Sequence, residues 1–365
     1  MTNGLNSIES FFRLDAAPPD PADLETPVPI VNLDVVENNL RRWQARCDQL
    51  GLKNRPHVKT HKMTALARFQ LAVGASGITV QKLGEAEVMA GAGISDILVT
   101  FNIVNRAKLE RLAELSRTAR VSVVADNAVV IEGIAWAASA AGRRIGVLVE
   151  CDTGGGRNGV QSPDEAAALA RQISGSPYLD CAGLMTFPAP GGRQPMAAFL
   201  AEAKSLMDGA DCVSVGGTPN MWSDDGLWVA TEYRAGTYIF NDLSTITAGA
   251  STESDCAVDI LSTVVSRPTA DRAIVDAGSK ALTSDQLGET GFGRVRGGRS
   301  RLYALTEEHG LLDTRDFERR LDVGDIVRII PNHICPVINL FDKVAVSKGG
   351  IVLGLATVDA RGRVA

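Results

Sequence analysis

The sequence predicts an α/β protein, a (β/α)8 TIM barrel followed by a C-terminal, mainly antiparallel β domain. Two observations predict the barrel: short β-prone runs alternate with helical patterns, and eight such runs recur at intervals of about one βα unit. A third observation predicts the second domain. From about Gly249 onward, strand-like runs are separated by Gly and Pro turns and lack long helices. An open, doubly wound sheet is the alternative, but it rarely uses so many uninterrupted repeats.

The elements follow in order after an irregular, acidic and proline-bearing start. We expect residues 1–26 to form an N-terminal arm that packs on the β domain, residues 27–248 to form the barrel, and residues 249–365 to form the β domain. The expected barrel strands are Ile30–Asp34, Arg55–Lys59, Gly77–Gln81, Asp96–Thr100, Val121–Asp126, Ile145–Asp152, Asp180–Phe187 and Asp211–Gly216. The expected strands of the β domain are Val258–Val265, Ala273–Asp276, Ser300–Leu305, Asp325–Ile330 and Ile351–Val358.

Helical patterns lie between the barrel strands, with apolar residues three and four positions apart. Ser162 and the three residues after it form a good helix start, because a capping serine is followed by a proline and two acids. The expected helices are Val36–Leu50, Thr64–Val73, Gly84–Ala92, Arg106–Ala119, Asn127–Ala141, Pro163–Ser174 and Gln194–Asp208.

Composition excludes several classes of protein. The chain has 365 residues, 45% of them hydrophobic, which is enough to bury a sizeable core. A formal net charge of −6 argues against nucleic acid as the main partner. We expect no membrane partner, because no apolar run reaches the length of a span and the start lacks the pattern of a signal peptide. The six cysteines are scattered, which predicts reduced thiols in a cytoplasmic protein.

A site is predicted where Arg55–Lys62 crowds basic residues at a strand-to-helix junction. Lys59 lies between His57 and His61, and a lysine beside other cations loses its proton more easily than a free one. Such a lysine suits Schiff-base chemistry. A basic, solvated strand end is the alternative for this stretch.

Other polar residues fall at the predicted carboxyl ends of barrel strands, where barrels place their chemistry. Gln81 ends one strand, Arg157 lies on a glycine-rich loop, and Gly216, Gly217 and Thr218 follow the last predicted strand. Barrels commonly hold a phosphate at that last loop through backbone N–H groups. A phosphate-bearing cofactor that takes a lysine Schiff base is pyridoxal 5'-phosphate (PLP).

A second cluster contains His333 and Cys335. Residues two apart on a strand point to the same face, so both side chains could reach one ion. Two protein ligands suit a catalytic metal that keeps positions open for water or substrate, although a lone His-x-Cys is more often packing.

The motifs in combination resemble the D-threonine aldolase/D-serine dehydratase family, which is similar to the alanine racemases: a PLP barrel of fold type III with a β domain. The resemblance covers nearly the whole chain from about Thr26. It rests on the runs 55–62, 81–87, 152–160, 216–219, 234–242, 276–280, 307–310 and 331–342.

The resemblance implies roles for residues. Lys59 would carry PLP as a Schiff base, with Lys62, Lys82 and Lys280 as rival lysines, and His333 with Cys335 would bind a divalent metal (Zn, Mn or Mg). The remaining cofactor-binding residues would be Gln81, Arg157, Gly216, Gly217, Thr218 and Tyr238, the last with a core aromatic as its alternative.

The implied activity is a PLP- and metal-dependent aldolase that cleaves D-β-hydroxy-α-amino acids such as D-threonine. The base would be a hydroxide on the metal or one of the catalytic candidates His57 and His61. A D-serine or D-threonine dehydratase is the alternative, a racemase using Tyr303 fits less well, and a PLP-carrying protein without turnover is a different class. We also expect a small-molecule amino-acid substrate and a homodimer.

One departure from the family pattern affects substrate choice. Many relatives carry an aromatic or acidic residue followed by His-Gly after the seventh strand. This chain instead reads Met-Thr-Phe-Pro-Ala-Pro-Gly-Gly over residues 185–192.

Overall fold

The computed structural model describes residues 7–189, 192–209, 211–317 and 320–365, so Pro190 and Gly191 of the departing run lie outside the described residues. Two compact units interleave along the chain. Unit 1 comprises Met1–Arg42, Thr60–Phe69 and Thr237–Gly362, and unit 2 comprises Trp43–Lys59, Gln70–Gly236 and Arg363–Ala365. The division of the chain into an N-terminal arm (1–26), a barrel (27–248) and a β domain (249–365) stays a prediction.

Unit 2 contains an eight-stranded sheet whose pairings are all parallel, in the order β3-β10-β9-β8-β7-β6-β5-β4. A parallel bridge between His57 and Thr79 also links the segment after β3 to β4, so the two ends of the sheet meet. The strands are β3 (Lys53–Asn54), β4 (Ile78–Val80), β5 (Asp96–Val99), β6 (Arg120–Ala125), β7 (Ile145–Cys151), β8 (Leu179–Thr186), β9 (Cys212–Gly216) and β10 (Glu232–Arg234). The predicted (β/α)8 fold class is confirmed.

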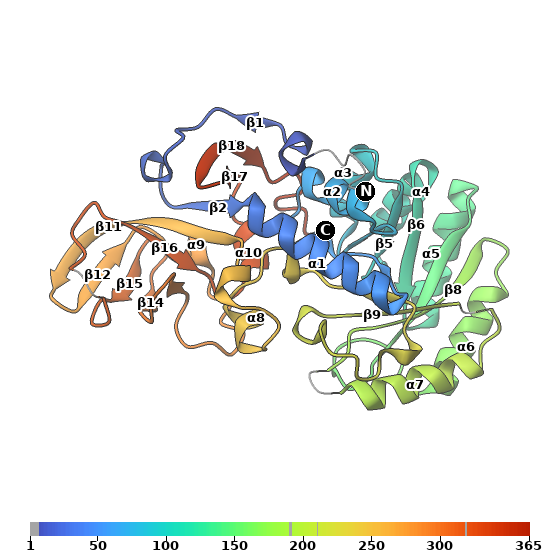
Figure 1. Cartoon of the computed structure of the whole chain (residues 1–365). Helices are drawn as coiled ribbons and strands as arrows, with labels where there is room; N and C mark the ends of the chain where they lie inside the picture. Colours follow the sequence, from blue (N-terminus) through green and yellow to red (C-terminus); the bar gives the residue numbers. More distant parts are fainter. Residues whose placement is uncertain (1–6, 190–191, 210, 318–319) are drawn as a thin grey trace. The chain divides into compact units, whose positions relative to one another are not determined.

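Helices follow the barrel strands and cover them. In Figure 1, α4, α5 and α6 lie along the outside of the sheet, in contact with β6, β7 and β8. The predicted start of α6 is confirmed, because the Ser162 hydroxyl accepts from the Glu165 amide and the Glu165 carboxylate accepts from the Ser162 amide. The helices are α1 (Leu33–Leu50), α2 (Thr64–Val73), α3 (Leu83–Gly91), α4 (Arg106–Thr118), α5 (Ala128–Ala141), α6 (Pro163–Ser174) and α7 (Arg193–Ser205), of which α1 and α2 contribute to both units.

The prediction that Ile30–Asp34 forms the first strand of the barrel is wrong. The chain does form a strand there, β2 (Val28–Asn32), but β2 pairs with β11 and β17 in the sheet of unit 1. Its place in the barrel is taken by β10, which was not predicted. Two of the three residues of β10, Glu232 and Arg234, are charged, so no hydrophobic pattern marks it.

Unit 1 contains a ten-stranded sheet in which, among the described residues, the β2–β17 pair alone is parallel. The N-terminal arm joins it, because β1 pairs with β18 and Lys348 forms an ion pair with Glu9 at 2.7 Å. The strands are β1 (Leu14–Asp15), β2, β11 (Val258–Thr269), β12 (Arg272–Val275), β13 (Arg294–Val295), β14 (Leu302–Leu305), β15 (Gly310–Asp313), β16 (Ile326–Ile330), β17 (Lys343–Lys348) and β18 (Ile351–Thr357). Short helices α8 (Leu243–Thr247), α9 (Ser279–Leu282) and α10 (Ile334–Ile338) complete the unit.

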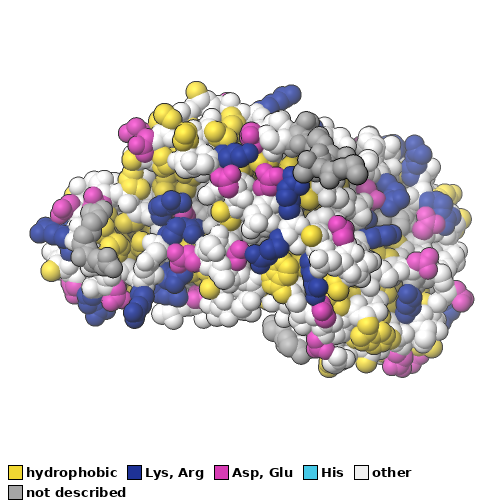
Figure 2. All heavy atoms as spheres, in the orientation of Figure 1, with side chains coloured by type: hydrophobic (Ala, Val, Ile, Leu, Met, Phe, Trp, Pro, Cys, Tyr) yellow, Lys and Arg dark blue, Asp and Glu magenta, His cyan; other side chains and the backbone are white. Residues whose placement is uncertain are grey.

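The visible surface carries both signs of charge. Figure 2 shows basic and acidic side chains interspersed over the face in view, rather than gathered by sign. Within the described residues, no helix is long and apolar enough to cross a bilayer.

Candidate active site

Lys59 lies in a short 3-10 turn, Val58–Thr60, rather than at a strand end, because β3 stops at Asn54. His57 fixes the start of this turn. Its Nδ1 accepts from the Lys59 amide at 3.4 Å, and its Nε2 lies 3.2 Å from Gln81 Oε1 and 3.3 Å from Thr100 Oγ1. An accepting Nδ1 leaves the proton on Nε2, which then donates to Gln81. The geometry therefore gives His57 a positioning role, and its action as a base stays a prediction.

His61 has a different environment within unit 1. The ring is fully buried, Nδ1 accepts from the Met63 amide at 3.0 Å, and the ring packs edge-on against Phe240. Tyr238, also of unit 1, lies in the turn Thr237–Ile239 and is buried. Both side chains are thus packed in the interior of their unit, and their proposed roles stay predictions.

The Gly216–Thr218 turn begins at the last residue of β9 and leads into a short 3-10 turn, Thr218–Asn220. Gly217 has φ +107°, a conformation that L side chains rarely adopt. A Cβ at Gly216 would lie 3.0 Å from the Arg234 carbonyl oxygen, and one at Gly217 would lie 3.7 Å from the Phe187 ring. A side chain at Gly216 would press against the backbone of β10, and one at Gly217 would be strained and would contact Phe187. The turn therefore fits a phosphate group held by backbone amides, as PLP requires.

Arg157 lies on the loop after β7, and more than half of its side chain is exposed. Its Nε donates to Asn158 Oδ1 at 3.0 Å, and its guanidinium lies 5.0 Å from the centroid of the Phe187 ring. Phe187, the first residue of the departing run that follows β8, is itself 47% exposed. The ring of Phe187 thus lies beside the predicted cofactor-binding arginine, and Pro188 and Ala189 stand where the family pattern has His-Gly.

Sequence reasoning missed buried charged residues of the barrel, among them Glu150 and Arg234. Glu150, in β7, is 1% exposed, and Arg234, in β10, donates to Ser214 Oγ at 2.6 Å and to the Thr186 carbonyl at 2.8 Å. Burial raises the pKa of Glu150 to about 7, against the opposing effects of Arg157 and Arg234. A single carboxylate inside the apolar run 145–151 was the signal that could have found Glu150.

The raised pKa of Glu150 predicts a stability that depends on pH. The folded protein holds this proton up to about pH 7, whereas the unfolded chain releases it near its ordinary value, so stability falls as pH rises between the two. Glu150→Gln mimics the protonated form. The variant should therefore match the wild type below about pH 4.5 and exceed its free energy of unfolding by up to about 3 kcal/mol above pH 7. Urea unfolding across this range measures the difference, and a constant offset at every pH would contradict it.

The metal-ligand candidates His333 and Cys335 do not lie on a strand, so the prediction that strand alternation brings them to one face is wrong. His333 is the N-cap of the five-residue helix α10, and Cys335 lies in its first turn. The two side chains nevertheless lie close enough to interact, because Cys335 raises the pKa of His333. His333 Nδ1 also lies 2.6 Å from Asp285 Oδ2, and Cys335 Sγ lies 3.1 Å from Thr60 Oγ1.

The charges around this pair favour a cation. Burial lowers the pKa of His333, but Cys335, Asp285 and the buried Asp242 together raise it to about 9. The same field would attract a divalent ion in place of the proton. Among the described residues, no group of three or more His, Cys, Asp or Glu side chains could hold a metal. An ion at His333 and Cys335 would leave positions open for water or substrate, as a catalytic metal does, and its binding there stays a prediction.

Comparison with known proteins agrees with this geometry. The alanine racemase N-terminal domain family matches residues 31–243, and the serine dehydratase domain family matches residues 257–347. D-threonine aldolase from Arthrobacter is 35% identical over 95% of this chain and 96% of its own length. 3-hydroxy-D-aspartate aldolase from Paracoccus denitrificans is 31% identical over 94% of both chains.

Solved structures agree as well. D-threonine aldolase from Filomicrobium marinum has a TM-score of 0.86 and 32% identity, with 97% of this chain and 99% of that chain covered. Alanine racemase from Clostridium difficile has a TM-score of 0.69 at 13% identity, over 92% of this chain and 99% of its own, and so shares the fold alone. The chain belongs to the D-threonine aldolase/D-serine dehydratase family of PLP-dependent lyases.

Proposed function

We propose that the protein is a PLP- and divalent-metal-dependent aldolase that cleaves D-β-hydroxy-α-amino acids into glycine and an aldehyde, with D-threonine as the model substrate. The observation that carries the proposal is the arrangement of unit 2. The turn that bears Lys59, the glycine turn after β9 and the Arg157 loop all follow the carboxyl ends of barrel strands. Two relatives that match this chain over nearly their whole length are D-threonine aldolases, which supports the proposed reaction.

Each residue has a stated task in this proposal. Lys59 holds the cofactor covalently, His57 orients the Lys59 turn, and Gly216 to Thr218 bind the phosphate. Bound PLP supplies an electron sink for the carbanion left when the Cα–Cβ bond breaks. Arg157 places a positive charge beside the cofactor.

The metal would be held by His333 and Cys335. It would supply Lewis-acid polarisation of the substrate hydroxyl, which lowers the pKa of that group. A thiolate with an imidazole favours Zn²⁺ over Mg²⁺, and Mn²⁺ remains compatible if oxygen ligands fill the other positions.

A dehydratase is the second candidate, favoured by one observation. Solved structures of D-threo-3-hydroxyaspartate dehydratase include a histidine-to-alanine variant and a cysteine-to-alanine variant, the latter in a metal-free form. The two substituted positions lie two residues apart in that enzyme, which is the spacing of His333 and Cys335. D-threo-3-hydroxyaspartate dehydratase from Delftia has a TM-score of 0.83 at 30% identity, with 92% of this chain and 98% of that chain covered.

The experiment is incubation of the PLP- and metal-loaded protein with D-threonine, D-serine and D-3-hydroxyaspartate. Aldol cleavage yields glycine and an aldehyde, whereas dehydration yields ammonia and a keto acid. Aldehyde in stoichiometric amount with glycine supports the aldolase. Formation of ammonia and a keto acid would instead support the dehydratase. Recovery of the L-enantiomer alone would support the racemase.

We also propose that the protein acts as a homodimer in the cytoplasm. In fold type III enzymes, the resemblance implies, the β domain of one subunit helps to cover the barrel mouth of the other. Sedimentation velocity at the assay concentration should give twice the chain mass of 38.6 kDa. A fully active monomer would contradict the proposal.

A further inference from the structure

The loop that carries Arg157 is fixed at both ends within unit 2. At its start, Asp152 Oδ1 accepts from the amides of Gly154, Gly155 and Gly156 at 2.8–3.1 Å. At its end, the Gly159 amide donates to Asp126 Oδ2 at 3.0 Å. Gly159 has φ +125°, and a Cβ there would come within 2.4 Å of the Asp152 nitrogen. The loop backbone is therefore held in one path.

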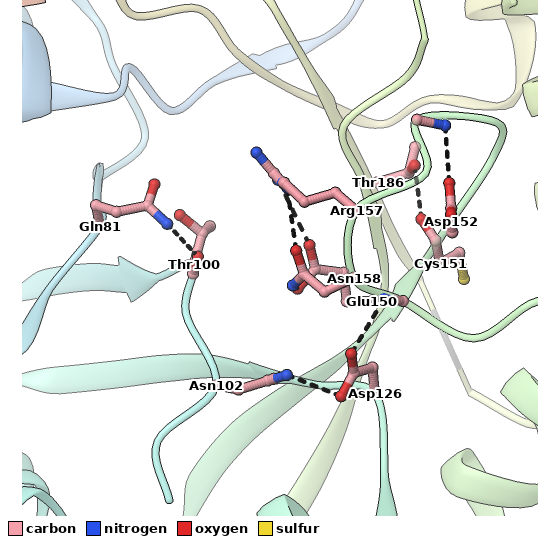
Figure 3. Close-up of polar contacts among 12 residues, drawn as sticks. Gln81, Thr100, Asn102, Asp126, Glu150, Cys151, Asp152, Arg157, Asn158 and Thr186 are labelled. Carbon is pink, nitrogen blue, oxygen red and sulfur yellow. Dashed lines mark hydrogen bonds and ion pairs between the residues drawn. The ribbon is translucent and has the colours of Figure 1, made fainter.

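Glu150 supports the middle of this loop. Its Oε2 accepts from Asn158 Nδ2 at 2.6 Å, and its Oε1 lies 3.7 Å from Arg157 Nη2. Asn158 in turn accepts from Arg157 Nε at 3.0 Å, so one amide connects the two charged groups. Figure 3 shows the Arg157 side chain extending away from its loop in the direction of Gln81, with Glu150 and Asn158 beneath it.

Glu150 and Arg157 differ strongly in exposure, and this difference indicates which of them supports the other. The Glu150 side chain is 2% exposed and the Arg157 side chain is 57% exposed. A buried carboxylate that is not fully paired is costly, and this one lies under a half-solvated guanidinium. We propose that Glu150 is a positioning residue that acts through its negative charge, holding Arg157 in place to meet the anionic cofactor.

The charges around Glu150 determine the pH above which its carboxylate is ionised and can hold Arg157. Arg157 on the loop and Arg234 on β10 favour its ionised form, whereas Asp126 on β6 and burial in β7 disfavour it. Cys151, its neighbour on β7, is buried with its pKa raised to about 12 and stays neutral. Glu150 is therefore charged above about pH 7 and loses its hold on Arg157 as pH falls below that value.

The test is PLP binding to the apoprotein, followed by the absorbance of the lysine-bound cofactor, for wild type, E150Q, R157A and the double variant. At about pH 8.5, E150Q should weaken PLP binding roughly tenfold, and at about pH 5.5 it should match the wild type, because Glu150 is then protonated. In the R157A background, E150Q should have no further effect at either pH. E232Q, which removes another buried barrel carboxylate that pairs with Arg55 and Ser214, serves as the control and should not show this dependence on pH.

A pH-independent effect of E150Q, or an equal effect with and without Arg157, would overturn the positioning role. The inference rests on the proposed function only in taking PLP as the ligand. A cofactor-free double-mutant cycle on urea unfolding therefore decides it separately. At about pH 8.5, R157A should destabilise the wild-type background more than the E150Q background. Equal destabilisation of the two backgrounds would overturn the inference even if aldol cleavage is observed. If aldol cleavage is not observed, the PLP-binding cycle and the unfolding cycle still test the inference.

Discussion

Replacement of Lys59 by alanine is expected to abolish lyase activity and the yellow colour of the lysine-bound cofactor. The loss should be on the order of 10⁴-fold or more, the scale found when a residue that forms the covalent intermediate is removed. Borohydride reduction of the wild type, followed by peptide mapping, should place the label on Lys59.

The rival lysines have other environments in the structure. Lys62 is buried and donates to the Ala360 carbonyl at 3.4 Å. Lys82 Nζ lies 3.3 Å from the centroid of the Phe101 ring, and Lys280 forms an exposed ion pair with Glu308. Lys280→Ala is the matched control and should keep both colour and activity. A label on any of the three would overturn the assignment of Lys59.

The sequence identified strands more reliably than it identified their partners. Val28–Asn32 has a strand pattern that is the same whichever sheet receives it, and β2 joined the sheet of unit 1. Conversely, β10 is held in the barrel by parallel pairing with β9 and β3, and its Glu232 forms an ion pair with Arg55, which is distant in sequence. Pairing partners of this kind are decided by tertiary contacts, which local patterns do not contain.

The candidate sites show the same limit. Lys59 and the glycine turn could be proposed from the sequence because their chemistry is local to short runs, and their roles stay predictions. Glu150 could not be assigned, because its role depends on Asn158 and Arg157 returning over the end of β7. The expected stability gain of E150Q above pH 7 indicates that the charge is kept at a cost in stability, which is common where a residue serves function.

The fold also explains why His333 and Cys335 meet although they do not lie on a strand. The Ile334 amide donates to the buried Asp242 carboxylate at 2.9 Å, which fixes the start of α10 next to α8. His333 as N-cap and Cys335 in the first turn then lie within reach of each other. A capped helix start thus achieves what strand alternation was expected to provide.

Removal of the metal is expected to abolish activity while the yellow colour stays. Two protein ligands should bind the ion loosely enough for EDTA to strip it, because a structural site would use four. Lys59, as proposed, would hold the cofactor independently of these ligands, so the absorbance should not change. Activity should return with Zn²⁺ or Mn²⁺ more readily than with Mg²⁺, since a thiolate is a soft ligand.

His333→Ala tests the same site within the chain. The loss should be several kcal/mol of transition-state stabilisation, or roughly a thousandfold in kcat/KM, the scale of a Lewis-acid contribution. His309 is exposed and hydrogen-bonds only with Thr306 among the contacts described, so His309→Ala is the matched control and should retain activity. Added metal should not rescue His333→Ala, whereas it should rescue the chelated wild type. Full activity of either the chelated enzyme or His333→Ala would exclude the metal from the reaction and favour a metal-free racemase.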